Sequence, residues 1–260
     1  MKIIREPKVY ILARQVLDED AIREFLDDEG MSWETDTDVP AEKIAEMAGR
    51  TCYLSFGKGR KSNKAYLEHI KEVKHGSVTE HAVFTFLITG ISRSLTHELV
   101  RHRAGWAYSQ LSQRYVDESD CNFVEPDFIA EDEELHAEFM AVLDMVRPAY
   151  EKMTDRLACL IAEKYPEIKD RTTLRKMARQ AARCILPNAT ETKICVTANV
   201  RALRHFIELR ANPAADLEIR RLAVMICRLM QKEAPNLFGD YEIYRLPDGT
   251  EACRTDYVKV

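Results

Sequence analysis

The sequence lacks the features that define several large classes of protein. Its seven cysteines are scattered and no C-x-x-C pair occurs, which argues against a disulfide framework and a cysteine zinc site. No apolar run reaches the roughly 18 residues of a membrane span, and residues 1–7 form no apolar signal segment. We therefore expect a protein of a reducing, cytoplasmic compartment with no membrane contact.

Basic charge and phosphate-binding loops are also missing. The net charge is −5, whereas non-specific nucleic-acid binding needs a basic surface. No series of stacking aromatic residues interleaves the basic ones. Neither a P-loop nor a G-x-G-x-x-G segment occurs, so a dinucleotide would not occupy a Rossmann site. A local basic pocket for a small anion remains compatible with this composition.

The composition itself is that of a globular protein. Hydrophobic residues make up 46% and charged residues 31% of the 260 residues, which suits one large domain with a sizeable core. The segments Ala82–Ile91 and Thr190–Ala198 are rich in β-branched residues, as buried strands are. With no repeat or linker between helical patterns, the sequence predicts a single α+β domain over residues 1–260, in which helices surround a small buried sheet.

Hydrophobic periodicity and the positions of capping residues and prolines predict the remaining elements. Lys8–Val16 is predicted as a strand, Ala104–Val116 as an irregular loop, and the helix Glu131–Lys164 as kinked or split at Pro148. Ser92 or Ser94 is expected to cap the helix Leu95–Arg103. Further helices are predicted at Asp18–Asp28, from Pro40 onward, and at Asn63–Val73, Asp170–Ile185, Arg201–Arg210 and Ala214–Lys232.

The stretch from Arg101 to Tyr115 concentrates hydrogen-bond donors. Its sequence, RHRAGWAYSQLSQRY, places Arg101-His102-Arg103 at a predicted helix end and a further arginine, Arg114, in a polar segment. The planar guanidinium suits phosphate and carboxylate, and Arg114 could act with Arg101 on one anion. The alternative is that the three cations only complement the helix macrodipole and contact water.

Arg210 continues an apolar stripe. Leu203, Phe206, Ile207 and Arg210 fall on one face of a helix, so the guanidinium should be partly buried and should need a partner. A bound anionic ligand is one candidate, and an ion pair with a core carboxylate is the other. Arg201 points to the opposite side of a straight helix, which agrees with two different ligands or with one structural arginine.

Metal catalysis is not predicted. His97 and Glu98 with His102 look like a zincin helix, but that motif needs histidines at i and i+4 on one face, and these are five apart. His75 and His81, six apart, also lack that spacing.

Four short motifs occur in order along the chain. The first is His75-Gly76-Ser77-Val78-Thr79-Glu80-His81, which leads into a strand. The second is Arg101-His102-Arg103, eight residues, then Ser112-Gln113-Arg114-Tyr115. The others are Arg183-Cys184-Ile185-Leu186-Pro187 and Asn199-Val200-Arg201, the latter running on to Leu209-Arg210.

Together these motifs resemble those of the flavin-dependent thymidylate synthases. In the second motif the family more often has seven residues than eight, so the loop at Ala104–Trp106 would carry the extra residue. The motif-bearing core spans about residues 48–232.

The resemblance implies roles for individual residues. Arg210 corresponds to the arginine that favours ionisation of uracil N3, and His75 to a histidine near flavin and substrate. Where relatives carry a flavin-contacting histidine this sequence has Asn212-Pro213-Ala214, so no role is assigned to Ala214. Contacts to FAD are implied for Cys52, Ser77, Glu80, Arg101, His102, Arg103, Asn199, Arg201 and His205. Contacts to dUMP are implied for Glu98, Arg101, Gln110, Leu111, Ser112, Gln113, Arg114, Arg183 and Arg210.

The resemblance also implies a fold and a reaction. The fold would be a small, mainly antiparallel sheet surrounded by helices. NADPH would reduce FAD, and 5,10-methylenetetrahydrofolate would supply the carbon that converts dUMP to dTMP, releasing tetrahydrofolate. A homotetramer with shared active sites is implied, in which Gln110–Arg114 serve a neighbouring subunit's nucleotide. Ser112 is assigned to binding, because a nucleophilic serine needs a base that the sequence does not reveal.

A non-catalytic nucleotide-binding module is the remaining alternative. It would explain the arginines but neither the His75–Glu80 element nor the order of the four motifs. Flavin absorbance in the purified protein would separate the two hypotheses.

Overall fold

The computed structural model describes residues 1–260 and contains helices and sheets in mixed order. The strands are β1 (Ile3–Ile4), β2 (Lys8–Arg14), β3 (Val83–Ser92), β4 (Trp106–Gln110), β5 (Phe123–Val124), β6 (Glu191–Asn199), β7 (Glu242–Arg245) and β8 (Glu251–Arg254). The helices are α1 (Glu19–Asp28), α2 (Pro40–Tyr53), α3 (Asn63–Glu72), α4 (Arg93–Leu99), α5 (Asp127–Ala130), α6 (Glu133–Lys164), α7 (Arg171–Ala182), α8 (Val200–Arg210), α9 (Leu217–Glu233) and α10 (Pro235–Phe238). Two 3-10 helices, η1 (Gly76–His81) and η2 (Arg183–Ile185), complete the list.

The largest sheet has four strands in the order β2-β3-β6-β4. Strands β4 and β6 run antiparallel, because the N–H of Leu111 donates to the carbonyl of Lys193 and the N–H of Asn199 donates to the carbonyl of Gly105. A parallel pair, β1-β5, and an antiparallel hairpin, β7-β8, form two smaller sheets. The α+β class with a small, mainly antiparallel sheet is thus confirmed.

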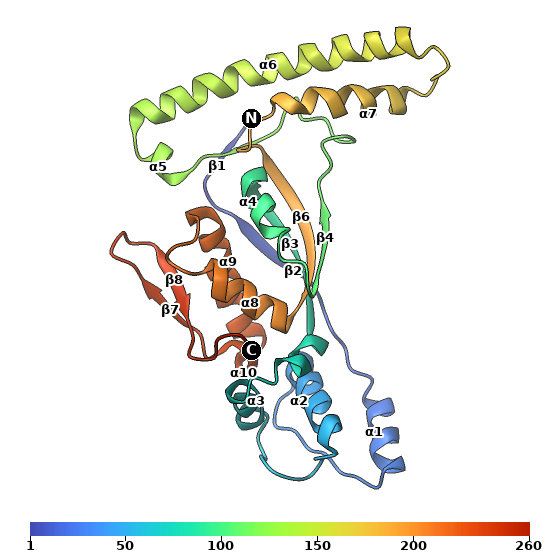
Figure 1. Ribbon diagram of the computed structural model, residues 1–260, viewed down its shortest axis with the longest axis vertical. Helices are drawn as coiled ribbons and strands as arrows, with labels where there is room; N and C mark the ends of the chain where they lie inside the picture. Colours follow the sequence, from blue (N-terminus) through green and yellow to red (C-terminus); the bar gives the residue numbers. More distant parts are fainter. The chain divides into compact units, whose positions relative to one another are not determined.

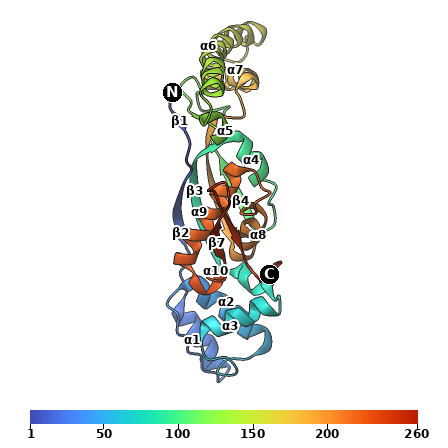
Figure 2. The ribbon, with the colours of Figure 1, turned by 90° about the vertical axis from the view of Figure 1, so that its left-hand side faces the viewer.

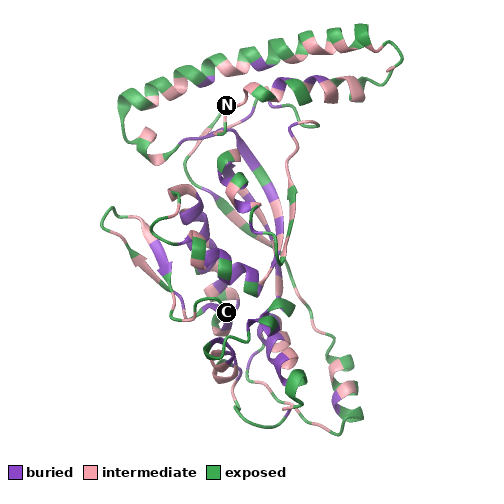
Figure 3. Cartoon of the chain, in the orientation of Figure 1, coloured by how far each residue is buried: buried purple, intermediate pink, exposed green.

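The chain forms two compact units, each assembled from three segments of the sequence. Unit 1 contains residues 1–8, 88–97 and 109–194. In it α6 and α7 run side by side (Figure 1). Most of α6 is exposed, with only Leu143 and Tyr150 buried (Figure 3).

Unit 2 contains residues 9–87, 98–108 and 195–260. Helices α8 and α9 pack together, and strand β8 packs on both of them. Leu203, Phe206, Ile207 and Ile226 are fully buried along this contact. Helix α3 contacts both α2 and α10, and the three helices lie together near the lower end of the view in Figure 2. Helix α8, held by this packing, carries residues of the candidate site.

Most predicted elements are confirmed, with three differences. Ser92 provides the cap for α4, since its hydroxyl accepts from the N–H of Leu95, but this helix ends at Leu99 rather than Arg103. The irregular loop predicted for Ala104–Val116 is wrong in part, because Trp106–Gln110 is strand β4. Helix α6 continues through Pro148, so the split that was one of the two predicted alternatives is wrong, while the kink stays a prediction. No helix combines the length and the apolar character that crossing a membrane would require.

Candidate functional site

The ends of α2 and α3 position Cys52, Tyr53 and His75 in unit 2. Leu54 and Lys74 each adopt a left-handed conformation, with φ of 44° and 58°, just past the end of a helix. Such a residue reverses the chain and satisfies the last helical carbonyls. Cys52 and Tyr53 close α2, and the ring of Tyr53 stacks on His75 at a centroid distance of 6.3 Å. Two helix ends thus place an aromatic pair at the surface.

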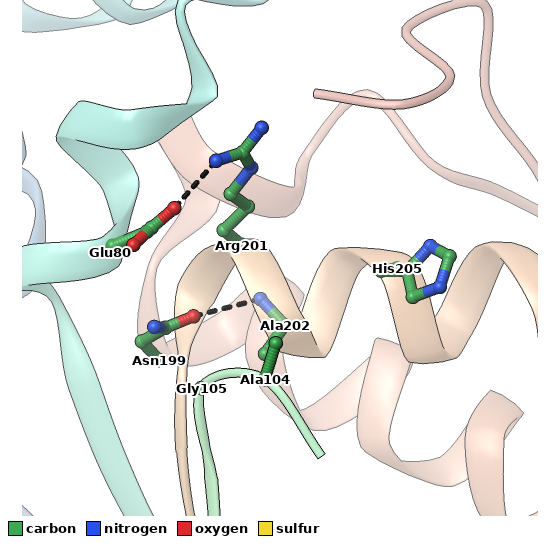
Figure 4. A pocket seen from close by; sticks show the side chains of 7 residues that line it. All are labelled: Glu80, Ala104, Gly105, Asn199, Arg201, Ala202 and His205. Atoms are coloured by element: carbon green, nitrogen blue, oxygen red, sulfur yellow. Dashed lines mark hydrogen bonds and ion pairs between the residues drawn. The ribbon is translucent and has the colours of Figure 1, made fainter. Parts of the chain in front are cut away.

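The start of α8 provides a pocket in the same unit. A cavity of about 200 Å³ is lined by Glu80, Ala104, Gly105, Asn199, Arg201, Ala202 and His205 (Figure 4). Four of these seven residues, Glu80, Asn199, Arg201 and His205, were predicted flavin contacts. Residues of η1 and of the start of α8 therefore line the same pocket.

The pocket's walls are small and its rim is polar. Gly105 has a φ of +73°, and a Cβ on it would lie 2.6 Å from the side-chain nitrogen of Asn199. The side chain of Asn199 in turn accepts from the N–H of Ala202, which caps α8. Figure 4 shows Arg201 reaching Glu80 above this floor, at 2.5 Å between Nη1 and Oε1.

These residues fit part of a flavin dinucleotide. A guanidinium and the positive end of an eleven-residue helix face the hollow, and both attract phosphate. The N–H groups of Val200 and Ala202 are already bonded within the protein, so Arg201 would be the main donor to an anion. The cavity is smaller than the roughly 300–1,000 Å³ typical of ligand sites. A pocket of this size would enclose only part of such a ligand.

A second cluster in unit 2 centres on Arg210, at the end of α8. Its Nη1 lies 2.5 Å from Oε2 of Glu98, and its Nε donates to Nε2 of His102 at 3.1 Å. The side chain of Arg210 is 22% exposed and that of Glu98 33% exposed. The predicted partial burial of this arginine is confirmed, and its partner is a partly exposed carboxylate rather than one in the core.

His102 is neutral in this cluster. Burial, together with the charges of Arg210 and His205, lowers its pKa to about 4. Because Arg210 donates to its Nε2, the remaining proton belongs on Nδ1. The ring packs against Phe206 at 5.2 Å and against Trp106 at 6.2 Å. His102 therefore orients Arg210 from inside the protein, whereas the flavin contact implied for it stays a prediction.

Three further predicted residues of unit 2 lie on the surface. Arg101 and Arg103 are exposed in the turn that follows α4. Tyr108 fixes this turn, since its hydroxyl lies 2.9 Å from the carbonyl oxygen of Leu99 and 2.6 Å from that of His102. Ser77 is exposed on η1. Their exposure leaves them accessible to ligands.

Unit 1 contains the remaining predicted nucleotide contacts, Gln110–Arg114 and Arg183. The amide of Gln110 donates to the hydroxyls of Thr96, at 3.0 Å, and Thr192, at 3.3 Å. Gln113 is buried, and Nε of Arg114 is buried without a hydrogen-bond partner. An orphaned guanidinium nitrogen is the kind of group that a bound anion would satisfy.

Arg93 and Glu118 join this region although the sequence analysis missed them. Arg93 donates to the carbonyl of Leu111 at 3.0 Å, which anchors the Gln110–Arg114 segment. Burial is the main cause that lowers the pKa of Arg93; the charge of Glu118 opposes the shift and that of Arg183 adds to it. Burial likewise raises the pKa of Glu118, against the effect of Arg93 and Lys193.

Tyr53, Trp106 and Arg93 carried a sequence signal that could have been used. Tyr53 follows Cys52, Arg93 comes directly after the predicted strand and the capping serine, and Trp106 begins an alternating W-A-Y-S-Q pattern. These positions could mark the three residues, but the sequence does not say that Tyr53 stacks on His75, that Arg93 bonds to Leu111 or that Trp106 packs on Phe206.

This α+β fold places one guanidinium in each of two polar clusters of unit 2, Arg201 beside the small pocket and Arg210 beside Glu98 and His102. Such groups suit a ligand that carries phosphate or other anionic oxygens. Comparisons with known proteins identify the family. Residues 35–236 match the sequence model of the family described as "Thymidylate synthase complementing protein". A "Flavin-dependent thymidylate synthase" from Mycobacterium sp. (strain JLS) is 50% identical over 238 residues, covering 90% of this chain and 93% of the relative. One from Corynebacterium aurimucosum is 46% identical over 233 residues, covering 88% and 92%.

A solved structure supports the fold. The crystal structure of a UMP/dUMP methylase, PolB, from Streptomyces cacaoi bound with 5-Br dUMP has a TM-score of 0.63 to this chain at 18% identity. It covers 92% of this chain and 96% of its own. Together with the family match, these similarities show that the chain belongs to the flavin-dependent thymidylate synthase family.

Proposed function

We propose that the chain catalyses the reductive methylation of dUMP to dTMP, with 5,10-methylenetetrahydrofolate as carbon donor and NADPH-reduced FAD as hydride source. The family membership supports the reaction class. Among the residues of this chain, the main support comes from Arg210, whose guanidinium is held in place by Glu98 and by neutral His102. When bound, the flavin would supply the hydride chemistry, and the protein would supply orientation and electrostatics.

Arg210 would stabilise negative charge on the uracil ring. Removing the N3 proton makes the ring electron-rich at C5, and a preorganised guanidinium nearby lowers the free energy of that state. Because His102 is neutral, it does not repel the guanidinium of Arg210. The lone pair on its Nε2 accepts a hydrogen bond from Arg210 and so orients the guanidinium. Glu98 would help to hold both the arginine and the nucleotide.

Anion binding would fall to the other arginines. Arg101, Arg114 and Arg183 would hold phosphate or ring oxygens of dUMP, with Gln110, Leu111, Ser112 and Gln113 around them. The orphaned Nε of Arg114 supports this role. Arg201, Asn199, His205, Glu80 and Ser77 would face FAD, with Cys52, Arg101, His102 and Arg103 as further contacts. His75 would lie near flavin and substrate, next to the ring of Tyr53.

We further propose a homotetramer that shares active sites and works in a reducing, cytoplasmic compartment. The small size of the pocket in one chain supports sharing. The seven free cysteines support the compartment.

The proposal is tested by incubating the purified protein with dUMP, FAD, NADPH and 5,10-methylenetetrahydrofolate and separating the products. Formation of dTMP and tetrahydrofolate in equal amounts is expected, with loss of both when NADPH or FAD is omitted. A protein that binds dUMP but forms no dTMP under these conditions would instead be a nucleotide-binding module.

A further inference from the structure

The last residues of the chain contact the motif that precedes β3. Val260 is buried, and a Cβ on Gly76 would lie 2.3 Å from its carbonyl carbon. Real Cβ atoms do not approach backbone so closely, so only glycine fits here without a shift. The backbones of Gly76 and Val260 are therefore in direct contact.

The tail segment, Thr255–Val260, is anchored to α8. Arg204 donates to the carbonyl of Tyr257 at 3.3 Å, and the N–H of Lys259 donates to Oε2 of Glu208 at 3.0 Å. Lys259 has a φ of 57°, a conformation that a non-glycine residue keeps only where its surroundings hold it. The path of the tail segment is thus imposed by α8.

A buried ion network makes this anchor rigid. Arg204 is 2% exposed and pairs with Asp240 at 2.8 Å. Lys71 reaches the same carboxylate at 2.8 Å, and Thr255 donates to it at 2.6 Å. Burial would raise the pKa of Asp240, but the hydrogen bonds and charges of Arg204 and Lys71 outweigh it and hold the pKa at about 2.

The tail segment reaches the place where η1 meets α8. The Nε of Arg201 lies 3.1 Å from the same Cβ position on Gly76. Arg201 pairs with Glu80, but both side chains are nearly half exposed, and exposed ion pairs contribute only about 0–1 kcal/mol. That pair alone is too weak to fix the spacing between the two elements, whereas the backbone contact at Gly76 can do so.

We propose that Thr255–Val260 is a positioning segment that holds Ser77, Glu80 and Arg201 in the arrangement that binds the flavin. This inference rests on the proposed function and adds a part of the chain to which no motif assigns a role. The tail segment touches Gly76 rather than the flavin, so it acts through η1 and α8.

The first test removes Lys259 and Val260 from the full chain. We expect the dissociation constant for FAD, measured by quenching of flavin fluorescence, to rise about 10-fold, a change of about 1.4 kcal/mol. The melting temperature of the flavin-free protein should hardly change, because Arg204 and Asp240 remain paired. Replacing Glu208 by Gln, which keeps an acceptor for the N–H of Lys259, should weaken FAD binding less than the deletion.

The second test uses Gly76→Ala in both lengths of chain. In the full chain the new methyl group collides with Val260, so FAD binding and the melting temperature of the flavin-free protein should both fall. In the shortened chain the collision is gone, and the substitution should cost much less, a non-additivity that reports direct contact. Gly30→Ala is the control, since no atom lies within 4 Å of its Cβ position, and its effect should be equal in both lengths.

Two results would overturn the inference. One is wild-type FAD affinity in the shortened chain; the other is equal costs of Gly76→Ala in both lengths. A wild-type protein that binds no FAD at all would overturn the proposed function as well, and the two failures are told apart by that measurement on the unaltered chain.

Discussion

Arg210 shows how one residue combines a predictable and an unpredictable property. Its place on the apolar stripe of α8 predicted partial burial and the need for a partner, and both are confirmed. The partner could not be predicted, because Glu98 is 112 positions away in the sequence. Only the fold brings the end of α4 to the end of α8.

Replacing Arg210 by alanine should abolish methylation without unfolding the protein. The side chain lies at the surface end of α8, so its loss leaves Glu98 accessible to water. Losing one preorganised charge-stabilising group typically costs about 100-fold or more in kcat. We expect that fall in dTMP formation, with a cooperative thermal transition retained.

The matched control is Arg228→Ala, which removes a surface guanidinium that pairs with Glu251 at 2.9 Å. It should keep wild-type turnover. Full activity in Arg210→Ala would refute a catalytic role for that arginine.

His102 should make stability depend on pH. Its pKa is about 4 in the folded protein and about 6.5 in an unfolded chain. Between these two values the unfolded chain binds a proton that the folded protein does not. The contribution of His102 to the free energy of unfolding is therefore fully present above about pH 6.5 and is lost as the pH falls toward 4. The contribution at stake is about 3 kcal/mol.

The measurement is denaturant unfolding at pH 7 and pH 4.5 for the wild type and for His102→Gln. The wild type should lose more stability over that range than the variant does. Equal losses would show that His102 titrates normally, and a nuclear magnetic resonance titration of its ring would then give a pKa near 6.5.

At the scale of elements, sequence patterns predicted the long apolar strands and the amphipathic helices well. Strands β3 and β6 and helix α8 lie within one or two residues of their predicted limits, because burial on both faces or on one stripe leaves a clear pattern. Strand β4 was missed although Trp106, Tyr108 and Gln110 alternate with exposed Ala107 and Ser109. Its polar residues and the adjacent Gly105 outweighed that alternation.

The loop before β4 should tolerate no side chain at Gly105. Alanine at this position would be strained by the left-handed φ. Its methyl group would also collide with the side chain of Asn199, which caps α8. We expect Gly105→Ala to lower the free energy of unfolding by about 1–3 kcal/mol and to weaken FAD binding.

Gly59→Ala separates the two causes. Gly59 has nearly the same φ, +74°, but no atom within 4 Å of its Cβ position. If both substitutions cost the same in urea unfolding, the contact with Asn199 contributes nothing.

At the scale of the whole molecule, the predicted nucleotide contacts are divided between the two units. Glu98, Arg101 and Arg210 belong to unit 2, while Gln110–Arg114 and Arg183 belong to unit 1. The sequence motifs marked these residues as nucleotide contacts, and the family resemblance predicts that Gln110–Arg114 serve the nucleotide of a neighbouring subunit.

Shared sites predict complementation between inactive variants. Arg210→Ala and Arg114→Ala should each be inactive, but random co-assembly should return about a quarter of the sites to wild-type composition if each site takes these residues from different subunits. Co-expression of both variants should therefore restore roughly that share of dTMP formation. The pair Arg210→Ala with Glu98→Ala is the control and should restore nothing, since those residues bond within one chain. No recovery in the first pair would contradict sharing.

The account's central claim is that this chain replaces the hydrogen at C5 of the uracil ring in a flavin-dependent reaction. It is tested most directly by tritium release from 5-tritiated dUMP with FAD, NADPH and 5,10-methylenetetrahydrofolate. We predict release that requires FAD and matches the dTMP formed. Flavin-loaded protein that binds dUMP yet releases no tritium would contradict the claim.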